Sequence, residues 1–331
     1  MRSIRARSTS LVLALLSAVA SSVSAQAVIT NGTISLGVNT TGDLNYNSVG
    51  VKFVPTGGDG TIAGCPCEGW GAGVSGGTFD GVTGFADQST GVGGLFDVTF
   101  SSTASTATST ATLRQGGTDV LQVTQFYHPS TVANLYQVDV TLKNLTGGVL
   151  GTGTDGIRYR RLMDWDIPPT VFNEFVTIQG WPATNLLATT DDGFRSADPF
   201  SSRGGISCPA NANFTDCGPD DHGALFDFGF NALDAGASRS LTIFYGATTN
   251  KTSALAALGA VGAEVYSLGT CNPAGSRTCT SSGEPNTFIF GFQGVGGTPV
   301  EPTTTPEPGT LLLLGSGVMG LVGVARRRYL A

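Results

Sequence analysis

Positive charge is scarce in this sequence of 331 residues. Lysine and arginine together number 17 against 24 aspartates and glutamates, and only 12% of the chain is charged. Three arginines lie within the first seven residues and three more at 326–328, so the stretch from Gln26 to Pro308 holds 11 basic and all 24 acidic residues, a net charge of −13. Nucleic acids and anionic membrane surfaces bind clustered positive charge. The composition therefore argues against both as partners of this stretch.

Histidines and metal-binding cysteine spacings are also scarce. The chain has two histidines, His128 and His222, and its six cysteines include no C-x-x-C pair, which disfavours a zinc centre. Matches to G-x-S-x-G at 73–77 and to G-x-G-x-x-G at 71–76 and 151–156 stand outside any strand–turn–helix pattern, and they follow from the 48 glycines,. The sequence therefore does not decide whether the protein is an enzyme, although it favours a protein without enzymatic activity.

The C-terminal end carries the most ordered set of signals. A Pro-Glu-Pro tripeptide is followed by an uncharged apolar run at 309–325 and by three arginines at 326–328. As a helix this run would span roughly 25 Å, the short end of what crosses a bilayer. We therefore predict a single transmembrane helix at 309–325, and the arginines after it favour a cytoplasmic C-terminus.

This order of signals resembles the PEP-CTERM sorting tail, which is also catalogued as the ice-binding protein C-terminal domain. The residues that match its motif and its basic cluster are Pro306, Glu307, Pro308, Arg326, Arg327 and Arg328. The resemblance implies export across the inner membrane of a Gram-negative bacterium, followed by recognition and removal of the tail by an exosortase. We place the tail at 306–328, after a Pro/Thr-rich linker at 299–308. An ordinary C-terminal anchor is the alternative.

The N-terminal 25 residues have the pattern of a signal peptide. Three arginines precede an apolar segment at 11–20, and small residues around Ala25 and Ala27 suit signal peptidase,. Cleavage there leaves an exported chain that is held transiently in the inner membrane by its C-terminal helix. Removal of the tail then leaves it at the cell surface or outside the cell.

Apolar residues alternate with polar ones in many segments of the body, which we place at 26–298. The positions that share a face are Tyr136, Val138, Val140 and Leu142; Phe226, Phe228 and Phe230; Leu241, Ile243 and Tyr245; and Phe288, Phe290 and Phe292. Such stripes at strand spacing are typical of a core face rather than of sugar-binding platforms. The pattern predicts an all-β fold, an antiparallel β-sandwich. One short helix is expected at 252–268, beginning near Asn250 or Thr252.

The six cysteines of an exported chain point to disulfides, because compartments outside the cytoplasm are oxidising. Cys208 and Cys217 flank one turn-rich loop, and Cys271 and Cys279 flank another, so each pair is expected to close locally. Cys65 and Cys67 are separated by one residue. A bond between them would be strained, so their pairing stays open.

The segment 158–169 holds the densest group of charges. As a strand it places Asp164 and Asp166 on one face, about 7 Å apart, with Trp165 on the other. Two buried carboxylates repel and need an arginine, a shared proton or a cation. An arginine from the same strand or a neighbouring one is favoured. A calcium ion and a paired-acid glycosidase site are the alternatives.

A second acidic group lies at 216–227. Its aspartates are oxygen ligands of the kind that calcium prefers, although the loop lacks the full D-x-[DN]-x-[DN]-G pattern with a terminal Glu,. The metal is left unassigned, with Ca²⁺ as the candidate cofactor. The candidate ligands are Asp164, Asp166, Asp220, Asp221 and Asp227.

These observations favour an exported cell-surface or extracellular-matrix protein with a structural or adhesive role in exopolysaccharide or biofilm. Extracellular polysaccharide is then a candidate partner, beside signal peptidase and exosortase. The alternative is a carbohydrate-binding protein or a carbohydrate-active enzyme, with Asp164, Asp166, Glu174 and His222 as acid/base groups. Ice or surface binding ranks third, since regular threonine ranks are confined to 101–112.

Overall fold

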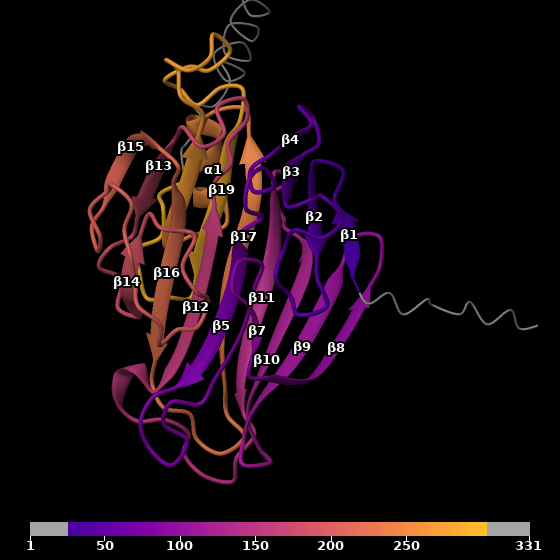
Figure 1. Ribbon diagram of the computed structural model, residues 1–331, viewed down its shortest axis with the longest axis vertical. Coiled ribbons are helices and arrows are strands. Elements are labelled where there is room, and N and C mark those ends of the chain that lie inside the picture. The colour runs from indigo at the N-terminus through magenta and orange to yellow at the C-terminus, as the bar shows by residue number, and fades with distance from the viewer. Residues whose placement is uncertain (1–25, 303–331) are drawn as a thin grey trace, which may run out of the picture.

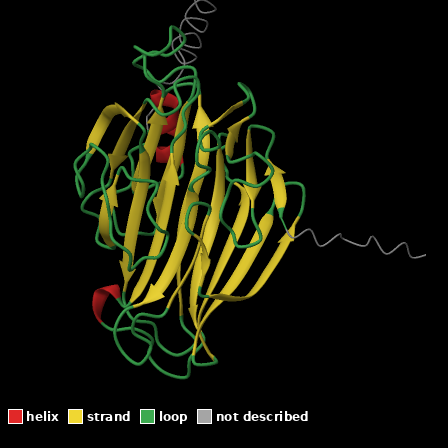
Figure 2. Ribbon diagram, in the orientation of Figure 1, coloured by secondary structure: helices red, strands yellow, loops and turns green. Residues whose placement is uncertain are grey.

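The alternating segments of the sequence form strands whose apolar faces meet in one core. The computed structural model describes residues 26–302, in which the strands form sheets of nine, six and four members, all with antiparallel neighbours. The two larger sheets run along the long axis of the molecule, with loops gathered at both ends (Figures 1 and 2). The predicted all-β, antiparallel architecture is confirmed for these residues.

The nine-stranded sheet has the order β15-β13-β18-β19-β17-β11-β10-β9-β8. Its strands are β8 (Leu95–Ser102), β9 (Ala107–Gln115), β10 (Thr118–Pro129), β11 (Leu135–Asn144), β13 (Glu174–Gln179), β15 (Phe214–Asp220), β17 (Ser238–Thr248), β18 (Val265–Thr270) and β19 (Thr287–Gln293). The six-stranded sheet contains β14 (Leu186–Thr190), β16 (Gly223–Phe230), β12 (Ile157–Asp164), β5 (Glu68–Val74), β6 (Thr83–Asp87) and β7 (Gly91–Gly93), in that order. The four-stranded sheet contains β1 (Ala27–Thr30), β2 (Ile34–Val38), β3 (Val51–Phe53) and β4 (Gly58–Asp59).

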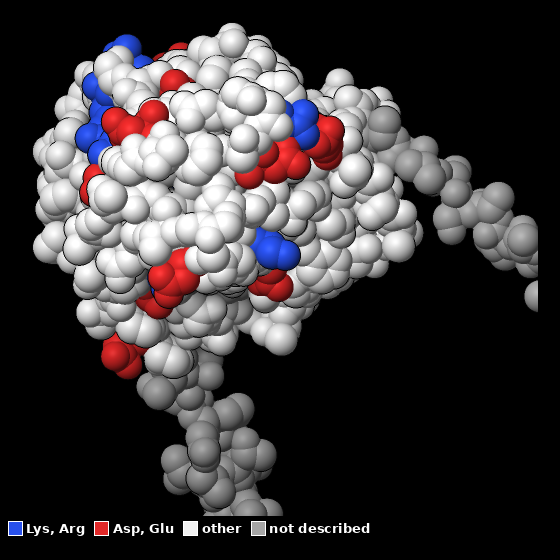
Figure 3. All heavy atoms as spheres, turned by 90° about the horizontal axis from the view of Figure 1, so that it is seen from below, with Lys and Arg blue, Asp and Glu red and all other residues white. Residues whose placement is uncertain are grey.

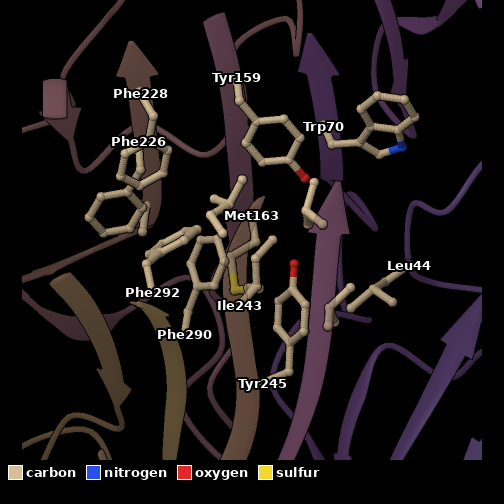
Figure 4. Packing of buried hydrophobic residues seen from close by; sticks show 14 of the residues in the cluster. Leu44, Trp70, Tyr159, Met163, Phe226, Phe228, Ile243, Tyr245, Phe290 and Phe292 are labelled. Carbon is tan, nitrogen blue, oxygen red and sulfur yellow. The ribbon is translucent and has the colours of Figure 1, made fainter. Parts of the chain in front are cut away.

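Aromatic side chains join the two larger sheets. Phe226 of β16 lies 5.5 Å from Phe290 and 4.9 Å from Phe292 of β19, measured between ring centroids. Phe228 also lies 4.9 Å from Phe292, and all four rings are fully buried. Figure 4 shows them beside Met163 of β12 and Tyr245 of β17. The aromatic stripes of the sequence are therefore core faces.

The helix α1 is shorter than the sequence predicts. It spans Lys251–Ala260. Asn250 is its N-cap residue, and the Asn250 side chain accepts a hydrogen bond from the Ser253 amide. The expectation of a helix to residue 268 is wrong, because Gly262 adopts a φ of +64° that ends the helical path. Val265–Thr270 then forms strand β18 between β13 and β19. The 3₁₀ turn η1 (Gly153–Asp155) is a separate short element.

Other expectations fall on residues that the structure does not describe. The signal peptide at 1–25, the transmembrane helix at 309–325 and the basic cluster at 326–328 all lie outside 26–302. Among residues 26–302, no helix is both long enough and apolar enough to cross a membrane.

All residues of strand β12 except Arg158 are buried, although several of them are charged. Arg161 Nε lies 2.6 Å from Glu68 Oε1, and both side chains are fully buried. Tyr245 of β17 donates to the same carboxylate at 3.0 Å, while the Leu44 amide donates to its other oxygen at 2.6 Å. Arg161 also reaches the Gly42 carbonyl at 3.2 Å. This network ties the two larger sheets to the segment that follows β2.

Removal of the Glu68 charge tests how much the fold depends on this network. In Glu68→Gln the Arg161 guanidinium stays buried without a counter-charge, so we expect the free energy of unfolding to fall by about 3–5 kcal/mol. Denaturant unfolding measures the change. The matched control is Asp97→Asn, which breaks the exposed pair with Arg114 and should change stability by about 1 kcal/mol or less. If both substitutions changed the free energy of unfolding by the same small amount, the buried network would contribute little to stability.

Candidate metal centre

Three carboxylates meet where β12 ends. Asp164 is the last residue of β12, Asp166 lies in the loop after it, and Asp221 lies between β15 and β16. One carboxylate oxygen of each residue lies within 4.8 Å of one carboxylate oxygen of each of the other two. Trp165 turns into the core, where its ring lies 6.5 Å from Phe288. The strand does not extend to Asp166, so loop geometry rather than strand alternation brings Asp166 beside Asp164.

Backbone hydrogen bonds hold the loops of this cluster in place. The Asp164 amide donates to the Cys67 carbonyl at 2.8 Å, and the Asp166 amide donates to the Gly60 carbonyl at 2.7 Å. Between them, the Trp165 amide donates to the His222 carbonyl at 2.9 Å. The segments around Gly60, Asp166 and His222 are thereby fixed against one another before any side chain acts.

Among residues 26–302, no basic side chain forms an ion pair with the carboxylates of the cluster. Asp164 is 1% exposed and Asp166 fully buried, and neither they nor Asp221 belong to any ion pair within 26–302. Asp164 Oδ1, Asp221 Oδ1 and both side-chain oxygens of Asp166 are buried without a hydrogen-bond partner. The expectation of an arginine partner is wrong for Asp164 and Asp166, because the three arginines of β12 pair with Asp155, Asp227 and Glu68.

Burial and mutual repulsion shift the titration of these groups. Burial, followed by the charges of Asp166 and Asp221, raises the pKa of Asp164 to about 10. Burial and the neighbouring Asp221 raise the pKa of Asp166 to about 7. Glu174, the first residue of β13, has its pKa raised to about 8, chiefly by burial, although the amides of His222 and Asn173 donate to it. Without a cation, the cluster therefore retains protons near neutral pH.

The side chain of His222 belongs to a different group. Its Nδ1 lies 3.1 Å from Asp191 Oδ2, and both residues are fully buried. Burial alone would raise the pKa of Asp191. The hydrogen bond from His222 and those from the amides of Ser207, Cys208 and Ile206 outweigh burial and lower that pKa to about 2. Cys208 Sγ is near the ring but is bonded to Cys217, so this group has no free thiolate for a metal.

The remaining candidates lie at the edge of the cluster or outside it. Asp220 accepts from the Asp221 amide at 3.0 Å. Asp227 is not available to a metal, because Arg160 Nε lies 2.6 Å from its Oδ1 and Arg203 contacts its Oδ2. Sequence reasoning overlooked Asp59, whose charge adds to the repulsion on Asp166, because it lies about a hundred residues earlier in the chain.

The cysteines pair locally. The structure joins Cys65 to Cys67, Cys208 to Cys217 and Cys271 to Cys279, with Cα–Cα distances of 5.1, 6.1 and 5.9 Å. The two longer loops close as their spacing indicates, and Cys65 pairs with its near neighbour rather than with a distant residue. The Cys65–Cys67 loop borders the cluster, because the Cys67 carbonyl accepts from the Asp164 amide. Cys208 lies instead beside His222 in the neighbouring group.

The raised pKa values predict how stability depends on pH when metal is removed. The folded pKa of Asp164, about 10, exceeds the ordinary value of 3.8, so the folded protein binds more protons than the unfolded chain between these values. In EDTA, the free energy of unfolding should therefore fall from pH 5 to pH 9, by up to about 1.4 kcal/mol per pH unit for each such proton. Denaturant unfolding at several pH values measures the slope.

The matched variant for this measurement is Asp164→Asn. It removes the strongest of the raised groups, so the fall in stability between pH 5 and pH 9 should become shallower. A wild-type protein whose stability in EDTA rises over this range would contradict the assignment.

Comparison with known proteins identifies one end of the chain. The family model of the PEP-CTERM protein-sorting motif matches residues 304–328. No curated protein matches the sequence.

Two solved structures share a distant similarity with the body. One is a putative aldose 1-epimerase from Escherichia coli K12, at 13% identity over 84% of this chain and 94% of that chain, with a TM-score of 0.34. The other is a galactose mutarotase related enzyme from Lactobacillus acidophilus, at 8% identity over 84% and 93%, with a TM-score of 0.31. Scores this low carry no argument about fold or activity. What the comparisons do establish is that this is a PEP-CTERM sorting domain-containing protein.

Proposed function

We propose that this is an exported protein of the cell surface or extracellular matrix with a structural or adhesive role among extracellular polysaccharide. The sorting motif at 304–328 supports exosortase-dependent export. In this proposal signal peptidase removes 1–25, the segment 309–325 holds the chain briefly in the inner membrane, and an exosortase releases the body. The final location is the cell surface or the medium.

One face of the body supports the adhesive role. Side chains on the outer side of the nine-stranded sheet form a row of hydroxyls across five adjacent strands, since the register pairs each with the next. The row is Thr99, Thr110, Thr124, Thr141 and Ser240. The hydroxyls of Thr110 and Thr124 lie 3.2 Å apart, and those of Thr141 and Ser240 lie 3.3 Å apart. Sequence reasoning missed this row, because its members are distant in the chain.

The composition of this face suits a neutral polysaccharide. Next to the row, Phe126 is 39% exposed, and its ring stacks on His128 at a centroid distance of 4.8 Å. Hydroxyls and exposed aromatic rings are the groups that contact sugars through hydrogen bonds and stacking. Near the row, Asp139 of β11 lies 3.2 Å from His128, and Lys143 of the same strand is exposed. Figure 3 shows the lower end of the molecule as largely uncharged, with acidic and basic side chains in small separate groups.

The enzyme alternative receives less support. Asp164 and Asp166 are at most 1% exposed, so a sugar ring does not reach both without displacement of the loops around them. Of the other two acid/base candidates, Glu174 is fully buried and His222 is occupied by Asp191. The hollow of about 210 Å³ that Phe175, Lys251 and Thr280 help to line contains none of these carboxylates.

The processing steps can be tested on the native protein. Mass spectrometry of material from the producing cells should find an N-terminus at Gln26 or Val28 and a C-terminus near Pro308. Deletion of the exosortase should leave the tail in place. A mature form from wild-type cells that retains Arg326–Arg328 would contradict the proposal.

A charge in the hydroxyl row tests the adhesive role. Thr124→Glu places a carboxylate in the middle of the face, and we expect it to weaken co-sedimentation with polysaccharide purified from the producing cells by about tenfold, equivalent to about 1.4 kcal/mol. The control is Thr131→Glu, which adds the same charge at an exposed turn. Equal retention of both variants would remove the support from this face. Affinity of the wild type for ice, lost in Thr124→Glu, would favour the ice-binding option instead.

A further inference from the structure

We infer that Asp164, Asp166 and Asp221 bind one calcium ion, and that this ion fastens the loops at the end of β12. The inference rests on the proposed function in one respect: export places the site outside the cytoplasm, where calcium ions are available. Its support comes from the donor atoms, their lack of partners and their place in the fold.

The donor set fits a hard divalent cation. The three residues offer only oxygen atoms, which lie within 4.8 Å of one another. Calcium binds oxygen at about 2.3–2.6 Å, so two ligands on opposite sides of the ion lie about 5 Å apart, whereas magnesium at 2.0–2.1 Å requires a tighter group. Thiolate and imidazole ligands, which softer metals prefer, are absent from this group of described residues. Calcium is therefore the ion that the spacing favours.

The partnerless oxygens are the observation that points to a ligand. Asp164 Oδ1, both side-chain oxygens of Asp166 and Asp221 Oδ1 are buried and accept no hydrogen bond. Buried carboxylates elsewhere in the same protein are satisfied: Asp191 accepts from three backbone amides and from His222. An unsatisfied buried polar atom is destabilising. Several of them converging on one point indicate a bound cation.

The position of the three residues gives the ion a structural role. Asp164 ends β12, Asp166 belongs to the loop toward β13, and Asp221 connects β15 with β16. An ion held by all three bridges the six-stranded sheet to an edge strand of the nine-stranded sheet. Asp164 and Asp166 are buried, whereas Asp221 is partly exposed, so the ion enters from the side of Asp221 and water completes its coordination there.

Calorimetric titration with calcium chloride tests the inference on mature protein purified from culture medium and stripped with EDTA. We expect one ion per chain. The melting temperature should rise by about 5 °C when free calcium reaches a hundredfold excess over Kd. Asp166→Asn should abolish both effects. The control Asp234→Asn removes an exposed carboxylate in the turn after β16 and should leave both unchanged.

Two further measurements keep the test decisive if Asp166→Asn does not fold. Asp221→Asn alters the partly exposed ligand and should weaken binding at least tenfold. Terbium used in place of calcium should luminesce on excitation of Trp165, and calcium should quench that signal by displacement. Wild-type protein that binds no calcium at neutral pH would overturn the inference in favour of shared protons, as would unchanged binding in Asp221→Asn.

The outcome is separable from that of the proposed function. Thr124→Glu should bind calcium like the wild type, because its side chain lies on the outer face of the nine-stranded sheet. In the wild type, calcium binding without polysaccharide retention would contradict the proposed function alone, and retention without calcium binding would contradict the inference alone.

Discussion

The burial of charge on and directly after strand β12 is the constraint on which the rest of this structure depends. The strand lies in the interior between β16 and β5, yet it carries two fully buried arginines, Arg160 and Arg161, and a buried aspartate. A second buried aspartate follows it. An isolated charge in a protein interior costs many kcal/mol, so each needs compensation nearby. The surrounding strands and loops are placed so that they supply this compensating charge or hydrogen bonding.

The arginines are compensated by the protein itself. Arg160 faces Asp227 across the β12–β16 pairing and also donates to the carbonyls of Ser196 and Ser201 at 2.7 and 3.1 Å. Arg161 and Glu68 share hydrogen bonds with Tyr127 and Tyr245 from the facing sheet. The aromatic core between the sheets is non-directional, whereas these contacts fix how the sheets are placed. Asp164 and Asp166 have no such partners within the part of the chain that the structure describes, and we infer that a cation supplies the missing charge.

Much of this fold could be predicted from local sequence, and the rest could not for physical reasons. Alternation identified the core faces of β11, β16, β17 and β19 because side-chain direction in a strand depends only on position. Asn250 could be recognised as a helix start because its capping bond is local. The helix end was missed because the pairing of Val265–Thr270 with two distant strands overrides helical periodicity.

The site could be predicted only in part. Asp164 and Asp166 are two residues apart, so their proximity follows from the chain itself. Their lack of an arginine does not, because the partners of Arg160 and Arg161 lie 67 and 93 residues away and are set by strand register. Asp221 and Asp227 looked equivalent in the sequence, and only the β12–β16 register separates a cluster member from an ion-pair partner.

A crystal structure of the mature protein grown with calcium chloride would show directly whether the three carboxylates share an ion. We expect one ion with an oxygen of Asp164, Asp166 and Asp221 each at about 2.3–2.6 Å, and water on the side of Asp221. Carboxylates hydrogen-bonded to one another without an ion, or turned toward an arginine, would contradict this expectation.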